Sequence, residues 1–143
     1  MGGPCFLSLN ALLIVYLAFA GVRDPGRSVY DAWNSVSETA IRAQRWPSLV
    51  ASARQGAMLS AGSPGQVAYF HSLACLGEFK LHRYDAALRS GVAARAAAIE
   101  GRKWRMLARA ENCLMRVYRL LGNLELSYEA GRAMLDALDR DPG

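Results

Sequence analysis

A row of four arginines and one asparagine is the most distinctive chemical feature of the sequence. It recurs at spacings of four, three, four and three residues and consists of Arg105, Arg109, Asn112, Arg116 and Arg119. These spacings place the five side chains on one stripe of a single helix, called the arginine stripe below. Each guanidinium offers a planar fork of donors that suits carboxylates. The stripe predicts a binding surface for an extended acidic peptide, although such rows are also typical of solvated helix faces.

Catalytic motifs are missing from the sequence. There is no glycine-rich phosphate loop, nucleophile elbow or HExxH motif, and the histidines are His71 and His82. His71 and Cys75 lie one helical turn apart, but zinc needs three or four ligands, so core packing is the preferred interpretation. The acidic residues Glu38, Glu78, Glu100 and Glu111 are expected on solvated helix faces. The sequence thus indicates a non-enzymatic protein without cofactor or metal.

The charge balance constrains the partners. Seventeen basic and twelve acidic residues give a formal net charge of +5, and none of the charged side chains lies in residues 1–20. This excess favours acidic partners. Nucleic-acid binding is not expected, because dense basic clusters with interleaved aromatic residues are missing outside the arginine stripe.

A helical hairpin recurs along the chain. Residues 67–100 show three- and four-residue spacings with a break at Leu81, His82 and Arg83, which predicts two helices joined by a turn. A shift of 40 residues superimposes Ala68 on Ala108, Ala87 on Ser127, Gly91 on Gly131, Ala93 on Ala133 and Ala97 on Ala137. A fixed period with this content is typical of a helical repeat array.

Another helix pair precedes these two. Ser28 is expected to cap a helix that begins at Val29, and Trp46 with Pro47 is expected to begin the next, since proline in a first turn loses no hydrogen bond. The turn-forming residues 60–65 end this pair. The sequence predicts an all-α domain over residues 28–143, with helix pairs at about 28–60, 66–100 and 104–140.

The repeat resembles a known family. The residues that carry the resemblance are Leu114, Tyr118, Gly122, Leu124, Ser127, Gly131 and Met134, and their order is similar to that of the tetratricopeptide repeat. The period exceeds the family's usual length of about 34 residues, Cys75 and Met115 stand where glycine is commonest, and the closing proline comes late, at Pro142. Mid-helix glycine costs roughly 1 kcal/mol relative to alanine, so Gly91 and Gly131 are expected where another helix packs closely.

The resemblance implies a short right-handed superhelix of three pairs, whose first helices line a concave groove. On that basis the arginine stripe shares the groove with Asn34, Glu38, Tyr69, Ser72 and Leu76. The implied function is a protein–protein interaction module that holds an acidic polypeptide. The alternative is a sensory or regulatory input region of a longer regulator, resembling the repeats that precede diguanylate cyclase and transcription-activator domains.

Residues 1–20 form an apolar leader. The run is apolar from Cys5 to Ala20 and ends Ala18, Phe19, Ala20, which is the small-x-small pattern of a signal-peptide cleavage site. Export with cleavage after Ala20 is therefore expected. A membrane anchor and a buried helix remain alternatives, the former because about 20 apolar residues span a bilayer.

Cys75 and Cys113 fall on the first helices of consecutive repeats. Packed helix axes lie about 8–10 Å apart, whereas a disulfide requires Cα atoms within about 7 Å. Two buried thiols are therefore expected, with a disulfide as the alternative in an oxidising compartment.

The last helix leaves large apolar side chains without an obvious cover. They are Leu124, Tyr128, Met134, Leu135 and Leu138. Because a terminal repeat normally carries a polar outer face, Tyr128, Leu135 and Leu138 are expected to mediate self-association or to dock on a partner. A leader that is never cleaved is an alternative cover.

Overall fold

The computed structural model describes residues 25–141, with side chains from residue 29 onward. This part of the chain folds into six α-helices and no strand: α2 (Pro25–Arg42), α3 (Trp46–Leu59), α4 (Pro64–Lys80), α5 (Tyr84–Glu100), α6 (Trp104–Leu120) and α7 (Leu124–Asp139). The predicted all-α class is confirmed. The leader at residues 1–20 lies outside the described residues.

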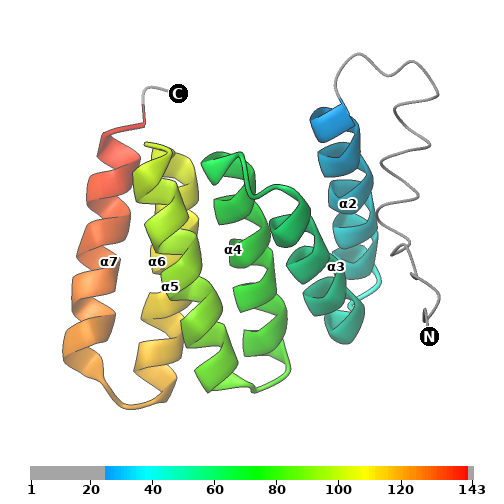
Figure 1. The fold of residues 1–143 in the computed structure, drawn as a ribbon. Helices are drawn as coiled ribbons and strands as arrows, with labels where there is room; N and C mark the ends of the chain where they lie inside the picture. The colour runs from blue at the N-terminus through cyan, green and yellow to red at the C-terminus, as the bar shows by residue number, and fades with distance from the viewer. Residues whose placement is uncertain (1–24, 142–143) are drawn as a thin grey trace, which may run out of the picture.

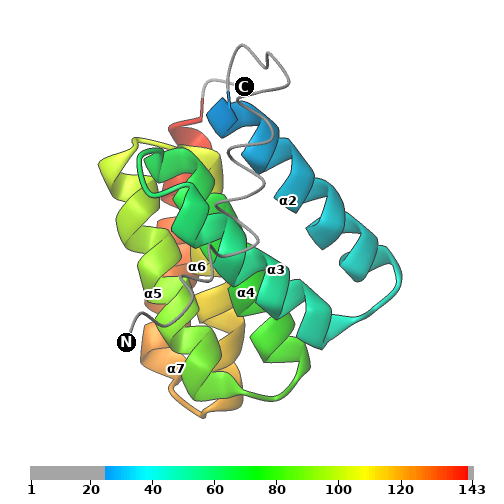
Figure 2. The same ribbon diagram turned by 45° about the vertical axis from the view of Figure 1, so that its right-hand side comes forward.

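The helices follow one another across the molecule, with α2 and α7 at opposite ends and α5 drawn in front of α6 (Figure 1). Each helix packs against the next one along the chain, and the view in Figure 2 shows the short connections at alternating ends of the array. α4 also packs against α6, which does not follow it directly in the chain. This contact brings the middle of the chain against the helix that carries the arginine stripe.

Four of the five connections use the same turn. Gln44, His82, Arg102 and Gly122 each have a positive φ, of 53°, 58°, 51° and 78° respectively. In each turn the following residue donates its backbone N–H to a carbonyl five residues earlier, as Arg83 does to Glu78 at 2.9 Å and Lys103 does to Ala98 at 2.8 Å. This is the Schellman arrangement, which satisfies carbonyls left free at a helix end. The predicted break at residues 81–83 is confirmed.

Proline marks the starts of α3 and α4. Each of these helices has proline in its first two positions, where the missing N–H costs no helical hydrogen bond. The expected start of the first helix at Val29 is wrong, since α2 begins at Pro25 and Ser28 lies within it. Proline again explains the difference, because its fixed φ favours the first turn of a helix.

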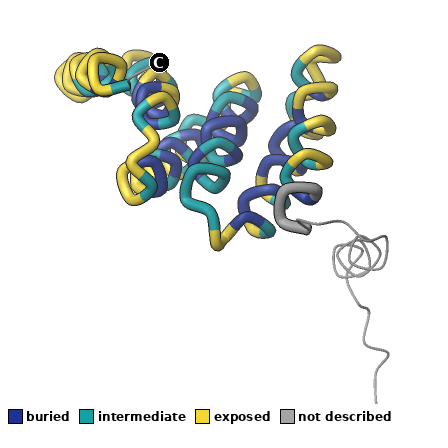
Figure 3. Tube along the Cα trace, turned by 90° about the horizontal axis from the view of Figure 1, so that it is seen from above, coloured by how far each residue is buried: buried dark blue, intermediate teal, exposed yellow. Residues whose placement is uncertain are grey.

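Close helix contacts are built on small residues. A Cβ atom at Gly91 would lie 2.7 Å from Leu114 Cδ2, and one at Gly131 would lie 3.2 Å from Met115 Sδ. The expectation that other helices pack on these two glycines is therefore confirmed. Gly56 plays the same part in α3, where a Cβ would lie 2.5 Å from the ring of the fully buried Phe70. Figure 3 shows that buried positions face neighbouring helices, whereas exposed positions predominate at the end that carries α7.

Two glutamates are buried, contrary to expectation. Glu78 accepts hydrogen bonds from Arg54 Nη2 at 2.7 Å and Ser90 Oγ at 2.6 Å, and Glu111 accepts two from Arg95. Both carboxylates face α5 rather than solvent, and they are only 1% and 3% exposed. Each carboxylate carries charged or polar donors from neighbouring helices, which offsets the cost of its burial. Glu38 and Glu100 are exposed, as expected.

Candidate binding pocket

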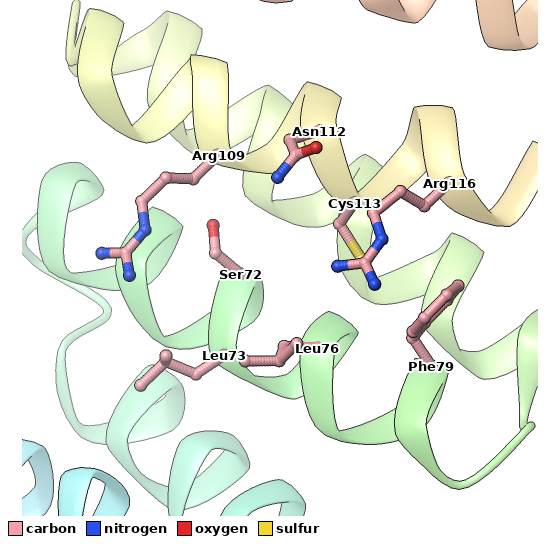
Figure 4. A pocket seen from close by; sticks show the side chains of 8 residues that line it. All are labelled: Ser72, Leu73, Leu76, Phe79, Arg109, Asn112, Cys113 and Arg116. Carbon is pink, nitrogen blue, oxygen red and sulfur yellow. The ribbon is translucent and has the colours of Figure 1, made fainter. Parts of the chain in front are cut away.

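A pocket of about 160 Å³ lies between α4 and α6 and is called the α4–α6 pocket here. It is lined by Ser72, Leu73, Leu76 and Phe79 of α4 and by Arg109, Asn112, Cys113 and Arg116 of α6. Figure 4 shows the guanidiniums of Arg109 and Arg116 at opposite ends of the pocket, with Leu73 and Leu76 below them on α4. The pocket therefore combines cationic groups on one helix with apolar groups on the other.

Arg109 is positioned by a chain of contacts that reaches α2. Its Cζ lies 5.4 Å from the ring centroid of Tyr69, which is a cation–π contact. The Tyr69 hydroxyl donates to Asn34 Oδ1 at 2.5 Å, and Asn34 Nδ2 donates to Glu38 at 3.4 Å. Burial raises the pKa of Tyr69, so the phenol stays protonated and keeps this donor role. Asn34 and Glu38 therefore reach Arg109 only through their contacts with Tyr69. None of these three residues lines the pocket.

Arg116 is held in the same manner on the other side of the pocket. Its Cζ lies 4.5 Å from the ring centroid of Phe79, and the residue is half-buried. The four ion pairs within residues 29–141 involve other arginines. Within that range, Arg109 and Arg116 therefore keep their hydrogen-bond donors free of carboxylates, while each guanidinium lies over an aromatic ring.

The ends of the arginine stripe do not join the pocket. Arg105 Nε donates to Asp141 Oδ2 at 2.9 Å, so its charge is engaged within the chain. Arg119 is exposed near the end of α6 and is not among the lining residues. The centre of the stripe, together with Ser72 and Leu76 of α4, is the part that the fold brings together.

A disulfide joins Cys75 and Cys113, so the expectation of two buried thiols is wrong. The Cα atoms lie 6.5 Å apart, within the range that a disulfide can bridge. Small side chains explain the approach of α4 and α6, because Ala68 and Ala108 pack in one buried cluster. The typical distance between helix axes therefore does not predict whether two cysteines can be bridged where alanines let the helices approach.

Three lining residues were not identified from the sequence. No sequence pattern places Leu73 or Phe79 in a site, and the expectation for Cys113 is a buried thiol. Phe79 lies seven residues after Ser72 on α4, so helical spacing would have placed it on the same face. Its packing under Arg116 depends on α6 and therefore required the tertiary structure.

Two wider hollows elsewhere lack this pattern of charge. One, of about 380 Å³, is formed mainly by small and apolar residues of α2 and the start of α3. The other, of about 450 Å³, lies at the α4–α5 turn, where Asp85 accompanies Arg83 and Arg89. The α4–α6 pocket differs from both, because two arginines and no carboxylate are among its lining residues.

The histidines and cysteines of the described chain do not gather into a metal site. Among residues 29–141, no group of three or more His, Cys, Asp or Glu side chains is placed to hold a metal ion. The sulfur of Cys75 is bonded to Cys113, so the pair with His71 offers no thiolate. No helix in residues 25–141 has both the length and the apolar character needed to cross a bilayer.

The outer face of α7 exposes large apolar side chains. Tyr128 is 69% exposed, Leu135 57% and Leu138 48%, and Leu124 is also exposed. Met134 differs from this group, because it packs on the cluster around Ala98 and Ala137. The four exposed side chains are called the α7 apolar face below.

Comparisons with known proteins found no match among protein-family models, curated proteins or solved structures. The resemblance to the tetratricopeptide repeat therefore remains a prediction that rests on the residues themselves.

Proposed function

We propose that the protein is a non-enzymatic interaction module that captures an acidic segment of a partner polypeptide in the α4–α6 pocket. The observation that carries this proposal is the pair Arg109 and Arg116, each oriented by an aromatic ring and neither neutralised by a carboxylate of the described chain. A carboxylate between them would receive charge-assisted hydrogen bonds, which are about twice as strong as neutral ones.

The size of the pocket favours a peptide side chain over a small molecule. Ligand pockets typically enclose roughly 300–1,000 Å³, whereas the α4–α6 pocket encloses about 160 Å³. Leu73 and Leu76 supply an apolar wall beside the arginines, so the preferred segment alternates acidic and apolar residues. The rest of the peptide would run along the exposed surface of α4 and α6.

The architecture proposed for this module is the right-handed superhelix of the tetratricopeptide repeat. Two features support it. The same left-handed turn recurs after α2, α4, α5 and α6, and α4 and α6, the first helices of consecutive pairs, pack directly on each other. Such arrays use the concave surface of the first helices for binding.

The decisive experiment reverses the charge of the pocket. Arg109→Glu combined with Arg116→Glu should abolish measurable capture of a fluorescein-labelled peptide of alternating glutamate and leucine, while the helical circular dichroism and the melting temperature stay nearly unchanged. The matched control is Arg89→Glu with Arg132→Glu, which makes the same change in net charge at exposed positions outside the pocket. If both double variants bind the peptide as tightly as the wild type does, the stripe is only a solvated face.

The proposed location is an oxidising compartment reached by export. The Cys75–Cys113 disulfide supports this, because such bonds persist mainly in secreted and periplasmic proteins. The leader pattern at residues 1–20 agrees with it, and a mature N-terminus at Gly21, found by mass spectrometry of the native protein, would test it. A membrane anchor that is never cleaved is the alternative.

A second candidate is a regulatory input region that transmits its state to an output domain or partner. The α7 apolar face favours it, because large exposed apolar side chains that recur along one helix face are typical of contact surfaces. A second copy of the chain is the other candidate for covering this face.

A further inference from the structure

The disulfide is the covalent link between the two walls of the α4–α6 pocket. Every residue that lines the pocket belongs to α4 or α6, and Cys75 and Cys113 join these two helices. Apart from the disulfide, the two helices are connected through α5 and by non-covalent packing. The spacing between the arginines of α6 and the leucines of α4 therefore depends directly on this bond.

The two sulfurs have different surroundings. Cys75 is fully buried, and its Sγ would lie 3.3 Å from a Cβ at Gly91, so α5 closes that side. Cys113 is partly exposed and lines the pocket between Arg109 and Arg116 (Figure 4). An external thiolate can therefore approach the disulfide from the pocket, and the sulfur it meets is that of Cys113.

We infer that the disulfide and the peptide regulate each other: the oxidised link holds the pocket in its binding geometry, and a bound peptide covers Cys113 and opposes reduction. This inference rests on the proposed peptide-binding function. It follows from the geometry, because the peptide and a reductant would occupy the same opening.

The reduction step is ordinary thiol–disulfide exchange. A thiolate of a dithiol reductant attacks Cys113 Sγ, a bond forms between these two sulfurs, and Cys75 leaves as a thiolate that takes up a proton. The second thiolate of the reductant then attacks its own sulfur in the mixed disulfide. Cys113 leaves as a thiolate and is protonated, and the reductant departs as a cyclic disulfide. Two electrons pass from the reductant to the cysteines.

The fold is expected to persist after reduction, because the packing around Phe70 and around Ala98 does not involve the sulfurs. What changes is the freedom of α6 relative to α4. A binding site that must be ordered by its ligand binds more weakly than a preorganised one. Linkage also requires reciprocity: the factor by which oxidation tightens peptide binding equals the factor by which peptide shifts the disulfide equilibrium.

The experiment uses the full-length chain with Cys5→Ser, so that its remaining cysteines are Cys75 and Cys113. The probe is the fluorescein-labelled peptide of alternating glutamate and leucine. Its Kd should rise at least about fivefold on reduction with dithiothreitol, the low end of typical couplings between sites. In a dithiothreitol redox buffer, saturating peptide should shift the dithiol–disulfide ratio towards disulfide by the same factor, as measured by alkylation and mass spectrometry.

The outcomes separate the two proposals. Equal Kd values for the oxidised and reduced chains, with clear binding by both, would overturn the inference and leave the proposed function standing. Failure of the oxidised chain to bind the probe would overturn the proposed function and this inference with it. The double variant Cys75→Ser with Cys113→Ser should bind like the reduced chain. If that variant loses its helical signal, the redox-buffer measurement on the intact disulfide still decides.

Discussion

Arg95 of α5 and Glu111 of α6 form a two-point ion pair, with Nε 2.6 Å from Oε1 and Nη2 2.7 Å from Oε2. The carboxylate is buried, while the guanidinium remains one-third exposed. The hydrogen bonds to Glu111 raise the pKa of Arg95 above its usual value, so the guanidinium is charged at all ordinary pH values. The contact fastens the helix behind the α4–α6 pocket to the helix that carries its arginines.

We expect Arg95→Met to lower the free energy of unfolding by about 2–3 kcal/mol, because Glu111 would be left buried without its donor. Urea denaturation measures this change. Arg89→Met, an exposed position on the same helix, is the control and should change stability by less than about 0.5 kcal/mol. Combining Arg95→Met with Glu111→Leu should recover much of the loss. An Arg95→Met variant as stable as the control would mean that the ion pair contributes nothing.

The repeated turn predicts a stabilising substitution. Arg102 has φ of 51°, a left-handed conformation that costs roughly 1–2 kcal/mol in residues other than glycine. Arg102→Gly should therefore raise stability by about 0.5–1 kcal/mol, after allowance for the greater freedom of glycine in the unfolded chain. Thermal melts followed by circular dichroism test this. Gly122→Ala, at the equivalent position of the last turn, should destabilise the protein by a similar amount. A lower melting temperature for Arg102→Gly would contradict the turn assignment.

Burial of His71 predicts how stability depends on pH. Desolvation lowers the pKa of His71 below 6.5, and the charge of Glu78 only partly opposes this effect. Below the pKa that His71 has in the unfolded chain, the unfolded chain binds the proton more readily than the folded chain does. The free energy of unfolding therefore decreases as pH falls from about 7 towards 5. His71→Gln should make this decrease shallower in urea denaturation across the same range. Identical slopes for His71→Gln and wild type would contradict the assignment.

The α7 apolar face predicts association. We expect the chain without residues 1–20 to form dimers or larger species in multi-angle light scattering, because Tyr128, Leu135 and Leu138 expose apolar surface that a contact would remove from water. Leu135→Lys with Leu138→Lys should yield monomers. Val92→Lys with Ile99→Lys adds the same charge at exposed apolar positions of α5 and should leave the assembly unchanged. A monodisperse wild-type monomer would defeat this prediction.

The centre of the candidate site was accessible from spacing alone. Side chains three and four residues apart share a helix face whatever the rest of the fold does, so spacing is enough to group Arg109, Asn112 and Arg116. Their convergence with Ser72 and Leu76 was an expectation from the resemblance, and the packing of α4 on α6 places these residues around one pocket. The ion pair of Arg105 with Asp141 could not be predicted from spacing, because it joins residues 36 positions apart.

By itself the sequence determined the local features: helices and most of their limits, the break at residues 81–83, and the need for close packing at Gly91 and Gly131. These depend on helical periodicity, proline, turn residues and side-chain size, which act within a few residues. Only the tertiary structure decided that Cys75 and Cys113 are bonded and that Glu78 and Glu111 are buried with donors. A distance across two helices, or a donor from another helix, depends on how alanine and glycine faces let the helices approach, and no spacing within one helix contains that information.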